Sequence, residues 1–276
     1  MLKYYIITPD YDPHSGGSLA LHLLGHELTK LGEDVTLCCN FKNPLYEGKI
    51  LSGDIDYRNA VGIYPEIIVG NPYKFKNVVR WLLNTPGVCG GNGIYEYNDI
   101  IYKYSNFFKY AHESEVKGLL SPIYIDTEVF KNHGKHTKGK MCHIIRKGHY
   151  KKQINHLSDS ICIDGYEQRG GNKYLSKIFN ECEYCVSYDH STMLYLQAAL
   201  CGCKVIVIPD ENVSIEEWKK SAPYNFYGVA YGFEDLNWIE ESLPYLKEHV
   251  EIMHKKSINS IINFNNQIKT LTNGVH

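Results

Sequence analysis

The stretch that decides the fold is Val186-Ser-Tyr-Asp-His-Ser-Thr-Met-Leu-Tyr-Leu-Gln-Ala-Ala-Leu-Cys-Gly-Cys-Lys-Val-Ile-Val-Ile-Pro209. Its pattern predicts a strand, a short polar loop, a helix, a turn at Gly202 and a second strand. The polar loop, Asp189–Thr192, lies where the first strand would end and the helix begin. The first turn of a helix has unpaired backbone N–H groups and the positive end of the helix dipole, so it binds phosphate well. The stretch therefore predicts a site that holds a nucleotide by its diphosphate and its ribose.

Two polar residues of this stretch carry a family resemblance. Asp189 opens the loop, and Gln197 follows after seven intervening residues, ahead of the glycine turn and the second strand. The segment resembles the donor-binding segment of retaining glycosyltransferases of the GT-B fold, especially the family-4 type, which have Glu at both positions. The resemblance implies that Asp189 is catalytic and contacts the donor sugar, that Gln197 holds the ribose hydroxyls, and that Ser191 and Thr192 bind the diphosphate. A Gln is uncharged, but its carbonyl still accepts a hydrogen bond from a hydroxyl. An ordinary βαβ unit with Asp189 near a helix N-cap would show the same pattern.

A basic cluster lies upstream of this segment. Arg146, Lys147 and Lys151 follow a predicted strand at Met141–Ile145. In the resembling family, an Arg and a Lys after the equivalent strand neutralise the donor diphosphate. Fixed cations there stabilise the charge that the leaving group gains, without a metal. Because the family separates its Arg and Lys by several residues, Lys151 is an alternative to Lys147; a solvated basic loop is the other interpretation.

The N-terminal residues predict a βαβ start. A strand at Tyr4–Thr8 leads through a loop into a helix with regularly spaced leucines, which Gly32 ends ahead of a strand at Val35–Cys38. Such a unit implies a parallel sheet. The loop lacks the G-x-G-x-x-G fingerprint, and no suitable acid follows the second strand, which excludes a hydride-transfer enzyme.

The loop before the first helix holds further candidates. Gly16 and Gly17 would let the backbone approach a ligand closely. They resemble the Gly-Gly loop of GT-B enzymes, which implies a place in donor binding, across from the phosphates and the acceptor. His14 in the same loop is a candidate for catalysis or acceptor binding, with a surface-loop histidine as the alternative.

Two polar residues at the end of a predicted strand are candidates for the acceptor-binding side of the site. Asn84 and Thr85 follow a predicted strand at Val78–Leu83. The resemblance places acceptor-side groups there, often a His-Asp pair, which this chain lacks. In a retaining transferase the departing phosphate can accept the proton instead, so a strong base from the enzyme is not required.

We predict an α/β fold that is GT-B-like, with two Rossmann-like domains facing a cleft. The first, 1–125, would be the acceptor-side domain and the second, 126–276, the donor-binding domain. A connector at Ser121–Phe130 resembles the interdomain segment of the family, and a last helix at about 236–266 is a candidate to pack back on the first domain. Other predicted strands lie at 66–69, 99–104, 160–164, 183–187 and 204–208, a further helix lies at 174–182, and 131–140 is predicted to be a loop.

Composition narrows the function classes. A net charge of −2 gives no electrostatic case for nucleic-acid binding. We expect no membrane span, since the chain has no 18-residue apolar run, and leave peripheral membrane contact open. The N-terminal apolar run is too short for a signal peptide, and nine cysteines without such a signal predict a reducing cytoplasm, with the inner face of the membrane as an option.

The cysteine spacing also raises the question of a metal. Cys182-x-x-Cys185 and Cys201-x-Cys203 could form a four-thiolate zinc site. Their positions at predicted strand ends favour buried structural cysteines instead. We therefore expect neither a metal nor a cofactor, with the nucleotide-sugar as substrate.

Together these features predict a glycosyltransferase that moves a sugar from a nucleotide-sugar donor to a glycan or lipid-linked acceptor, in cell-surface polysaccharide synthesis by family analogy. A non-catalytic nucleotide-sugar or glycan-binding homologue and a nucleotide-sugar epimerase of the same fold are the alternatives. The sequence leaves open the donor's base and sugar, the acceptor and the oligomeric state.

Overall fold

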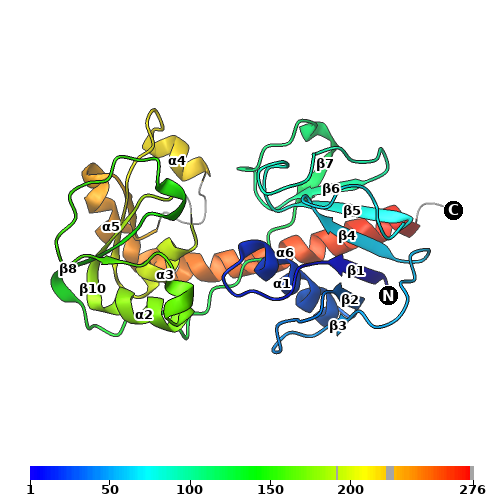
Figure 1. Ribbon diagram of the computed structural model, residues 1–276, viewed down its shortest axis with the longest axis horizontal. Helices are drawn as coiled ribbons and strands as arrows, with labels where there is room; N and C mark the ends of the chain where they lie inside the picture. The colour runs from blue at the N-terminus through cyan, green and yellow to red at the C-terminus, as the bar shows by residue number, and fades with distance from the viewer. Residues whose placement is uncertain (191, 222–226, 274–276) are drawn as a thin grey trace. The chain divides into compact units, whose positions relative to one another are not determined.

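The chain forms two compact units in a computed structural model that describes residues 1–190, 192–221 and 227–273 (Figure 1). The first unit comprises Met1–Tyr124 and His254–His276, and the second comprises Ile125–Met253. The predicted ranges, 1–125 and 126–276, differ from these units at Ile125, which belongs to the second unit, and from His254 onward, which belongs to the first. No helix of the described residues is long and apolar enough to cross a membrane.

The first unit is built on a seven-stranded sheet in the order β3-β2-β1-β4-β5-β6-β7. Every pair of neighbouring strands is parallel. The strands are β1 (Lys3–Ile7), β2 (Asp34–Cys38), β3 (Lys49–Ile50), β4 (Val61–Pro65), β5 (Asn77–Leu82), β6 (Ile100–Lys103) and β7 (Val116–Leu119).

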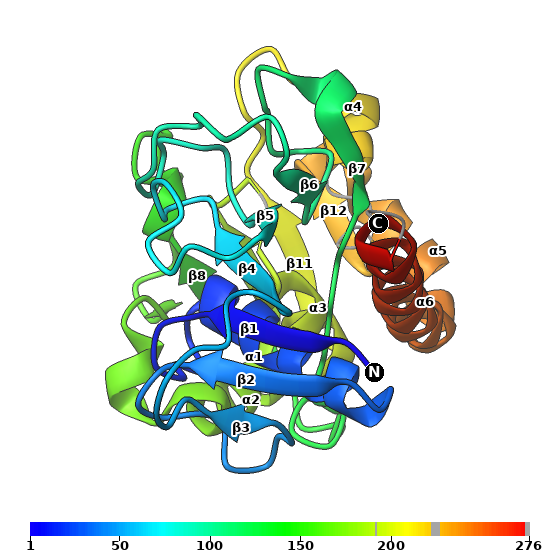
Figure 2. The same cartoon turned by 90° about the vertical axis from the view of Figure 1, so that its right-hand side faces the viewer.

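Two helices bury their apolar sides in the core of this unit. They are α1 (Gly16–Lys30) and α6 (Leu246–Asn273), the latter seen nearly end-on in Figure 2. Their leucine, isoleucine and phenylalanine side chains share one buried cluster with β1, whose members include Leu21, Leu24, Leu28, Ile261, Phe264, Ile268, Tyr4 and Ile6. A second cluster, around Tyr5, Tyr64 and Phe75, packs on the opposite side chains of β1 and β4. The alternation of Tyr4, Tyr5 and Ile6 between the two clusters is what a strand buried on both faces requires.

The second unit has a five-stranded parallel sheet in the order β12-β11-β10-β8-β9. Its strands are β8 (Thr137–Ile144), β9 (Ile161–Cys162), β10 (Cys182–Ser187), β11 (Lys204–Val207) and β12 (Val229–Tyr231). Its helices are α2 (Gly171–Glu181), α3 (Leu194–Leu200), α4 (Ile215–Ser221), α5 (Leu236–Ser242) and the start of α6. Short 3-10 helices, η1 to η5, occupy Glu113–Glu115, Arg146–Gly148, Tyr166–Arg169, Phe233–Asp235 and Leu243–Tyr245.

The predicted α/β class with Rossmann-like parallel sheets is confirmed, and three element predictions need correction. The strand expected at 66–69 is β4, which ends at Pro65; Ile67 and Val69 are exposed, and the N–H of Ile68 bonds back to the carbonyl of Pro65, so the chain turns directly after β4. The expected loop at 131–140 contains the start of β8, which pairs with β10. The single late helix is divided by η5, where a proline removes a backbone N–H donor.

Candidate functional site

The candidate site lies where the strand order of the second sheet changes direction. β9 lies on one side of β8, whereas β10, β11 and β12 follow on the other. β8 and β10 are adjacent and parallel, with Ile144 opposite Ser187, so the loops after both strands leave the same sheet edge. Ligands of open α/β sheets bind outside the carboxyl ends of strands at such a switch point.

Asp189 is the buried acid of this edge. Its side chain is 0% exposed, and its Oδ1 accepts a hydrogen bond of 2.7 Å from the backbone N–H of Lys147. Its Oδ2 is buried and has no hydrogen-bond partner among the described residues. Burial raises the pKa of this carboxyl, against a smaller opposing effect of the Lys147 N–H and the nearby cations of Lys147 and Arg146. A buried polar atom without a partner needs an explanation, and a ligand hydroxyl would supply one.

The chain after β8 is shaped to bring the Lys147 N–H to Asp189. The carboxylate of Asp164 accepts backbone N–H groups of Ile145 and Arg146, at 3.1 and 3.0 Å. Gly148 then packs directly on the next strand end, since a Cβ atom at this position would lie 2.0 Å from the carbonyl oxygen of Tyr188. Only glycine fits this contact. Sequence reasoning missed both Asp164 and Gly148, whose roles depend on the pairing of β8 with β10.

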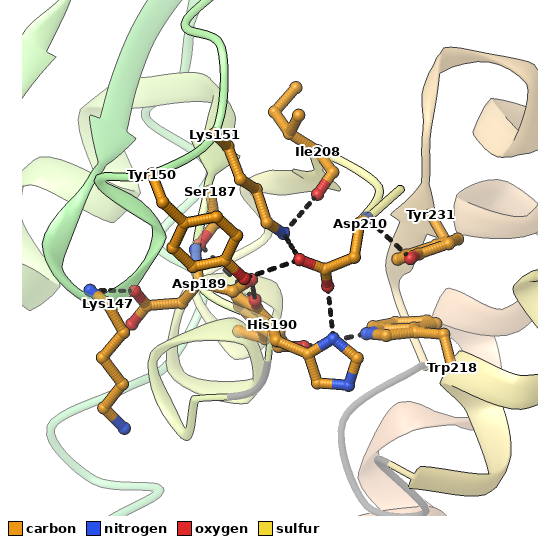
Figure 3. A network of polar contacts seen from close by, with 11 residues as sticks. Lys147, Tyr150, Lys151, Ser187, Asp189, His190, Ile208, Asp210, Trp218 and Tyr231 are labelled. Atoms are coloured by element: carbon orange, nitrogen blue, oxygen red, sulfur yellow. Dashed lines mark hydrogen bonds and ion pairs between the residues drawn. The ribbon is translucent and has the colours of Figure 1, made fainter. Parts of the chain in front are cut away.

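Arg146 and Lys147 supply positive charge beside this carboxylate. Arg146 is half-buried, with its guanidinium 6.0 Å from the centre of the Tyr166 ring, and Lys147 is exposed. Figure 3 shows the Lys147 side chain extending away from Asp189 although its backbone N–H points to it. No ion pair joins either cation to a carboxylate within the described ranges. Both charges are thus available to an anionic ligand.

Lys151 differs from the exposed phosphate ligand that the sequence suggests. Its ammonium lies 2.9 Å from Asp210 Oδ1 and donates to the carbonyl of Ile208 at 2.8 Å, and its side chain is 5% exposed. Its charge is therefore already neutralised. Of the two lysines predicted to act with Arg146, the geometry therefore favours Lys147 over Lys151 as the one that can bind an anion.

The helix after the polar loop begins later than predicted. α3 starts at Leu194, and the hydroxyl of Thr192 accepts the Leu194 N–H at 3.4 Å, so Thr192 precedes the first turn. Ser191 lies outside the described residues. Gln197 lies on α3, and its Oε1 is buried without a hydrogen-bond partner in the part of the chain that the structure describes. The two members of the predicted Asp–Gln pair therefore each have one oxygen without a partner in the described ranges.

The glycines predicted to contact the donor belong to the first unit. Gly16 and Gly17 are the first residues of α1, with Ser15 as N-cap. A Cβ atom at Gly16 would meet nothing within 4 Å, and one at Gly17 would make ordinary contact with Leu83 at 3.7 Å. The fold of this unit thus does not itself require glycine there. His14 precedes them, and its backbone N–H donates to Asp12 at 2.8 Å.

Asn84 and Thr85 follow β5, beside a buried acid that sequence reasoning missed. Glu66 directly follows β4, and its Oε2 accepts the N–H of Leu83 at 2.9 Å. Burial raises the pKa of Glu66. The Thr85 hydroxyl accepts the N–H of Lys109 at 3.0 Å, and the amide of Asn84 donates to Cys89 at 3.1 Å. The available signal was an acid directly after a buried strand, but Glu66 lies inside the strand predicted at 66–69, whereas β4 ends at Pro65.

The four cysteines of the alternative zinc site, Cys182, Cys185, Cys201 and Cys203, are buried in the core of the second unit. Cys182 and Cys185 neighbour Cys142 and Cys203, whereas Cys201 neighbours Ser176 and Asn180 instead. The neighbouring Cys142 and burial raise the pKa of the Cys182 thiol, so it stays protonated. No group of His, Cys, Asp or Glu side chains in the described ranges is arranged to hold a metal ion.

Comparison with known proteins places the fold. No protein-family model matches the chain, and no curated protein matches it in sequence. Among solved structures, a sucrose-phosphate synthase from Thermosynechococcus elongatus matches with a TM-score of 0.56 and 12% sequence identity, over 99% of this chain and 100% of that one. At this identity the likeness shows a shared fold over the whole chain.

Proposed function

We propose that the protein is a glycosyltransferase that binds a nucleotide-sugar in its second unit and passes the sugar to a glycan or lipid-linked acceptor. The observation that carries the proposal is Asp189: a fully buried carboxylate at the switch point, held by one oxygen, with no partner for the other among the described residues. The shared fold with a sucrose-phosphate synthase supports it.

The proposed roles follow from the contacts. Oδ2 of Asp189 would accept a hydroxyl of the donor sugar, which satisfies a group that otherwise destabilises the fold. Arg146 and Lys147 would bind the diphosphate, which takes the electron pair of the bond to the anomeric carbon as that bond breaks. Gln197 would accept a ribose hydroxyl at its buried Oε1.

The finer points come from the resemblance of the Asp189–Gln197 segment to family-4 enzymes. We propose that the anomeric configuration is retained and that fixed cations, rather than a metal, stabilise the leaving group. The acceptor-side role of the first unit, through His14, Asn84 and Thr85, is a proposal of the same kind, as are a cytoplasmic location and a pathway of polysaccharide synthesis.

Thermal stabilisation by ligands tests the donor site. A ligand that binds only the folded state raises the melting temperature. We expect one nucleoside diphosphate and its sugar conjugates to stabilise the protein among a panel covering all common bases. Arg146→Ala should weaken the effect of the diphosphate, and Lys177→Ala, an exposed lysine on α2, should not. If no compound of the panel stabilised the wild-type protein, the donor site would be wrong.

Turnover separates the transferase from a non-catalytic binder. The binder is favoured by the uncharged Gln197 in place of a second acid. We expect release of the nucleoside diphosphate from the stabilising donor when oligosaccharide and lipid-linked acceptors are supplied. Donor binding without release for any acceptor would favour the binder.

A further inference from the structure

Given the proposed function, on which this step rests, we infer that the first unit binds a sugar acceptor through uncharged ring hydroxyls. The carboxylate of Glu66 accepts a hydrogen bond from the acceptor, and the hydroxyl of Tyr95 donates one to it. The ligand of this site is thus a sugar ring with free hydroxyls, rather than a phosphate group.

Glu66 lies where the strand order of the first sheet changes direction. β2 and β3 lie on one side of β1, whereas β4 to β7 follow on the other, and Glu66 directly follows β4 (Figure 2). In the second sheet the central strand is β8, and Asp189 lies just past the end of its neighbour β10. Each unit therefore has a buried acid beyond the carboxyl end of the strand next to its central one. Open α/β sheets bind ligands at this position.

The surroundings of the two acids are also built alike. Glu66 is 3% exposed, and its Oε2 accepts the N–H of Leu83, directly after β5, at 2.9 Å. Gly91, in the next loop, has a φ of +75°, and a Cβ atom there would lie 2.0 Å from the carbonyl oxygen of Glu66. Asp189 likewise accepts a backbone N–H, and Gly148 packs on the carbonyl just before it. In both units a glycine lets a neighbouring loop approach the backbone beside the acid.

The carboxylate of Glu66 has room for a further hydrogen bond. Burial raises its pKa, and the backbone N–H groups of Leu83, Glu66 itself and Asn84 oppose this effect. An ionised carboxylate has about four acceptor positions, so three backbone donors leave one for a ligand. No lysine, arginine or histidine of the described residues contributes to the pKa shift of Glu66. Its charge is therefore not neutralised within the part of the chain that the structure describes.

Tyr95 supplies a hydrogen-bond donor near this carboxylate. Its hydroxyl oxygen is buried and has no hydrogen-bond partner in the described ranges. Burial raises the pKa of Tyr95 to about 12, with a smaller contribution from Glu66 against the opposing charge of Arg80, so the hydroxyl keeps its proton at neutral pH. The ring is held between the guanidinium of Arg80, 5.2 Å from its centre, and the ring of Tyr110, with centres 5.7 Å apart. A ligand bound at Glu66 would give this buried hydroxyl the partner it needs.

These neighbours favour a hydroxyl over a phosphate. A carboxylate without a cation repels a phosphate, and like charges brought together in an interface are costly. Arg80 cannot offset this, because it is 0% exposed and already paired with Asp99 at 2.6 Å. A sugar hydroxyl, by contrast, is both donor and acceptor. One hydroxyl can bond to Glu66 and Tyr95 together, or two neighbouring hydroxyls can take one role each.

The residues predicted for the acceptor side lie next to Glu66. Asn84 directly follows Leu83, whose side chain would be 3.7 Å from a Cβ atom at Gly17. The side chains of Asn84 and Thr85 make hydrogen bonds within the loops that follow β5 and β6. These two residues thus shape the loops around Glu66, which leaves the buried acid as the main contact for a ligand.

The test measures dissociation constants for uncharged methyl glycosides of the common hexoses, N-acetylhexosamines and deoxyhexoses, by saturation-transfer NMR. Inorganic phosphate and a sugar phosphate are the charged probes. We expect at least one glycoside to bind the wild type, and to bind Glu66→Gln about tenfold more weakly, because a hydrogen bond to a charged acceptor becomes one to a neutral acceptor. Tyr95→Phe should bind it about fivefold more weakly, as for one lost neutral hydrogen bond. Glu115→Gln, at an exposed acid of the same unit, is the matched control and should bind as the wild type does.

Stability and donor binding separate a ligand contact from a structural role. Glu66→Gln keeps an oxygen for the Leu83 N–H, so we expect its melting temperature and its affinity for the nucleoside diphosphate to match the wild type. Equal glycoside binding by the wild type and both variants, or binding of the charged probes alone, would overturn the inference. So would a wild type that binds no glycoside, or losses that come only with a lower melting temperature. Failure of every nucleotide and nucleotide-sugar to bind the wild type would instead refute the proposed function.

Discussion

Asp189 and Asp210 follow neighbouring strands of one sheet, and their carboxylates are in opposite states. Asp210 accepts hydrogen bonds or ion pairs from Tyr150, Lys151 and His190. Asp189 has one backbone partner and one buried oxygen with none among the described residues. Burial raises the pKa of Asp189, whereas the partners of Asp210 lower its pKa despite burial. One edge of a sheet thus holds an acid whose carboxylate is paired within the protein beside an acid with one oxygen that has no partner among the described residues.

The largest effect on stability should come from removing the carboxylate of Asp210, which is paired within the protein. Asp210→Ala leaves the buried ammonium of Lys151 without its partner, and removing one member of a buried pair costs about 3 to 5 kcal/mol. We expect a loss of this size in the free energy of unfolding, measured by urea denaturation. Glu128→Ala removes the acid of an exposed ion pair with Lys131 and should change stability little. A small effect of Asp210→Ala would show that the network does not hold the sheet edge together.

Removing the charge of the unsatisfied acid should act on binding and not on stability. Asp189→Asn keeps an oxygen for the Lys147 N–H, so we expect folding at least as stable as in the wild type. Loss of a charged acceptor should weaken nucleotide-sugar binding about 10- to 100-fold. Denaturation and calorimetry on the same preparation check both halves. A stability loss as large as that of Asp210→Ala would make Asp189 a structural acid too.

A third prediction tests how the backbone is brought to Asp189. Gly148→Ala places a Cβ atom against the Tyr188 carbonyl, so we expect a loss of about 2 kcal/mol in the free energy of unfolding. Gly16→Ala meets open space at the start of α1 and should be neutral or slightly stabilising. Because Gly16 was predicted to contact the donor, normal ligand binding by Gly16→Ala would also remove it from the site. Equal stability of the two variants would contradict the tight contact at Gly148.

The same edge shows what sequence patterns can and cannot predict. Apolar runs fixed the type of most strands, because burial on both faces selects continuous apolar residues, as in β5 and β11. The polar loop after β10 could be placed for the same reason. Asp164, Gly148 and Asp210 could not, since their roles depend on which strands are neighbours. The ion pair of Lys151 with Asp210 could not be predicted either, because an ion pair between distant segments leaves no local periodicity in the sequence.

The pH dependence of stability should separate the two acids with the smallest effects. Asp189 has a raised pKa in the folded state, so the folded protein binds more protons than the unfolded chain, and this residue's contribution to stability declines as pH rises above the ordinary aspartate pKa. Asp210 has a lowered pKa, so its contribution is present above the ordinary value and is lost as pH falls below it. We therefore expect Asp189→Asn to gain stability relative to the wild type as pH rises from about 4. Asp210→Asn should instead lose stability relative to the wild type as pH rises up to about 4, the range below the ordinary aspartate pKa. Urea denaturation of the three proteins on both sides of about pH 4 measures both slopes, and slopes of equal sign would show that the two carboxylates are in the same state.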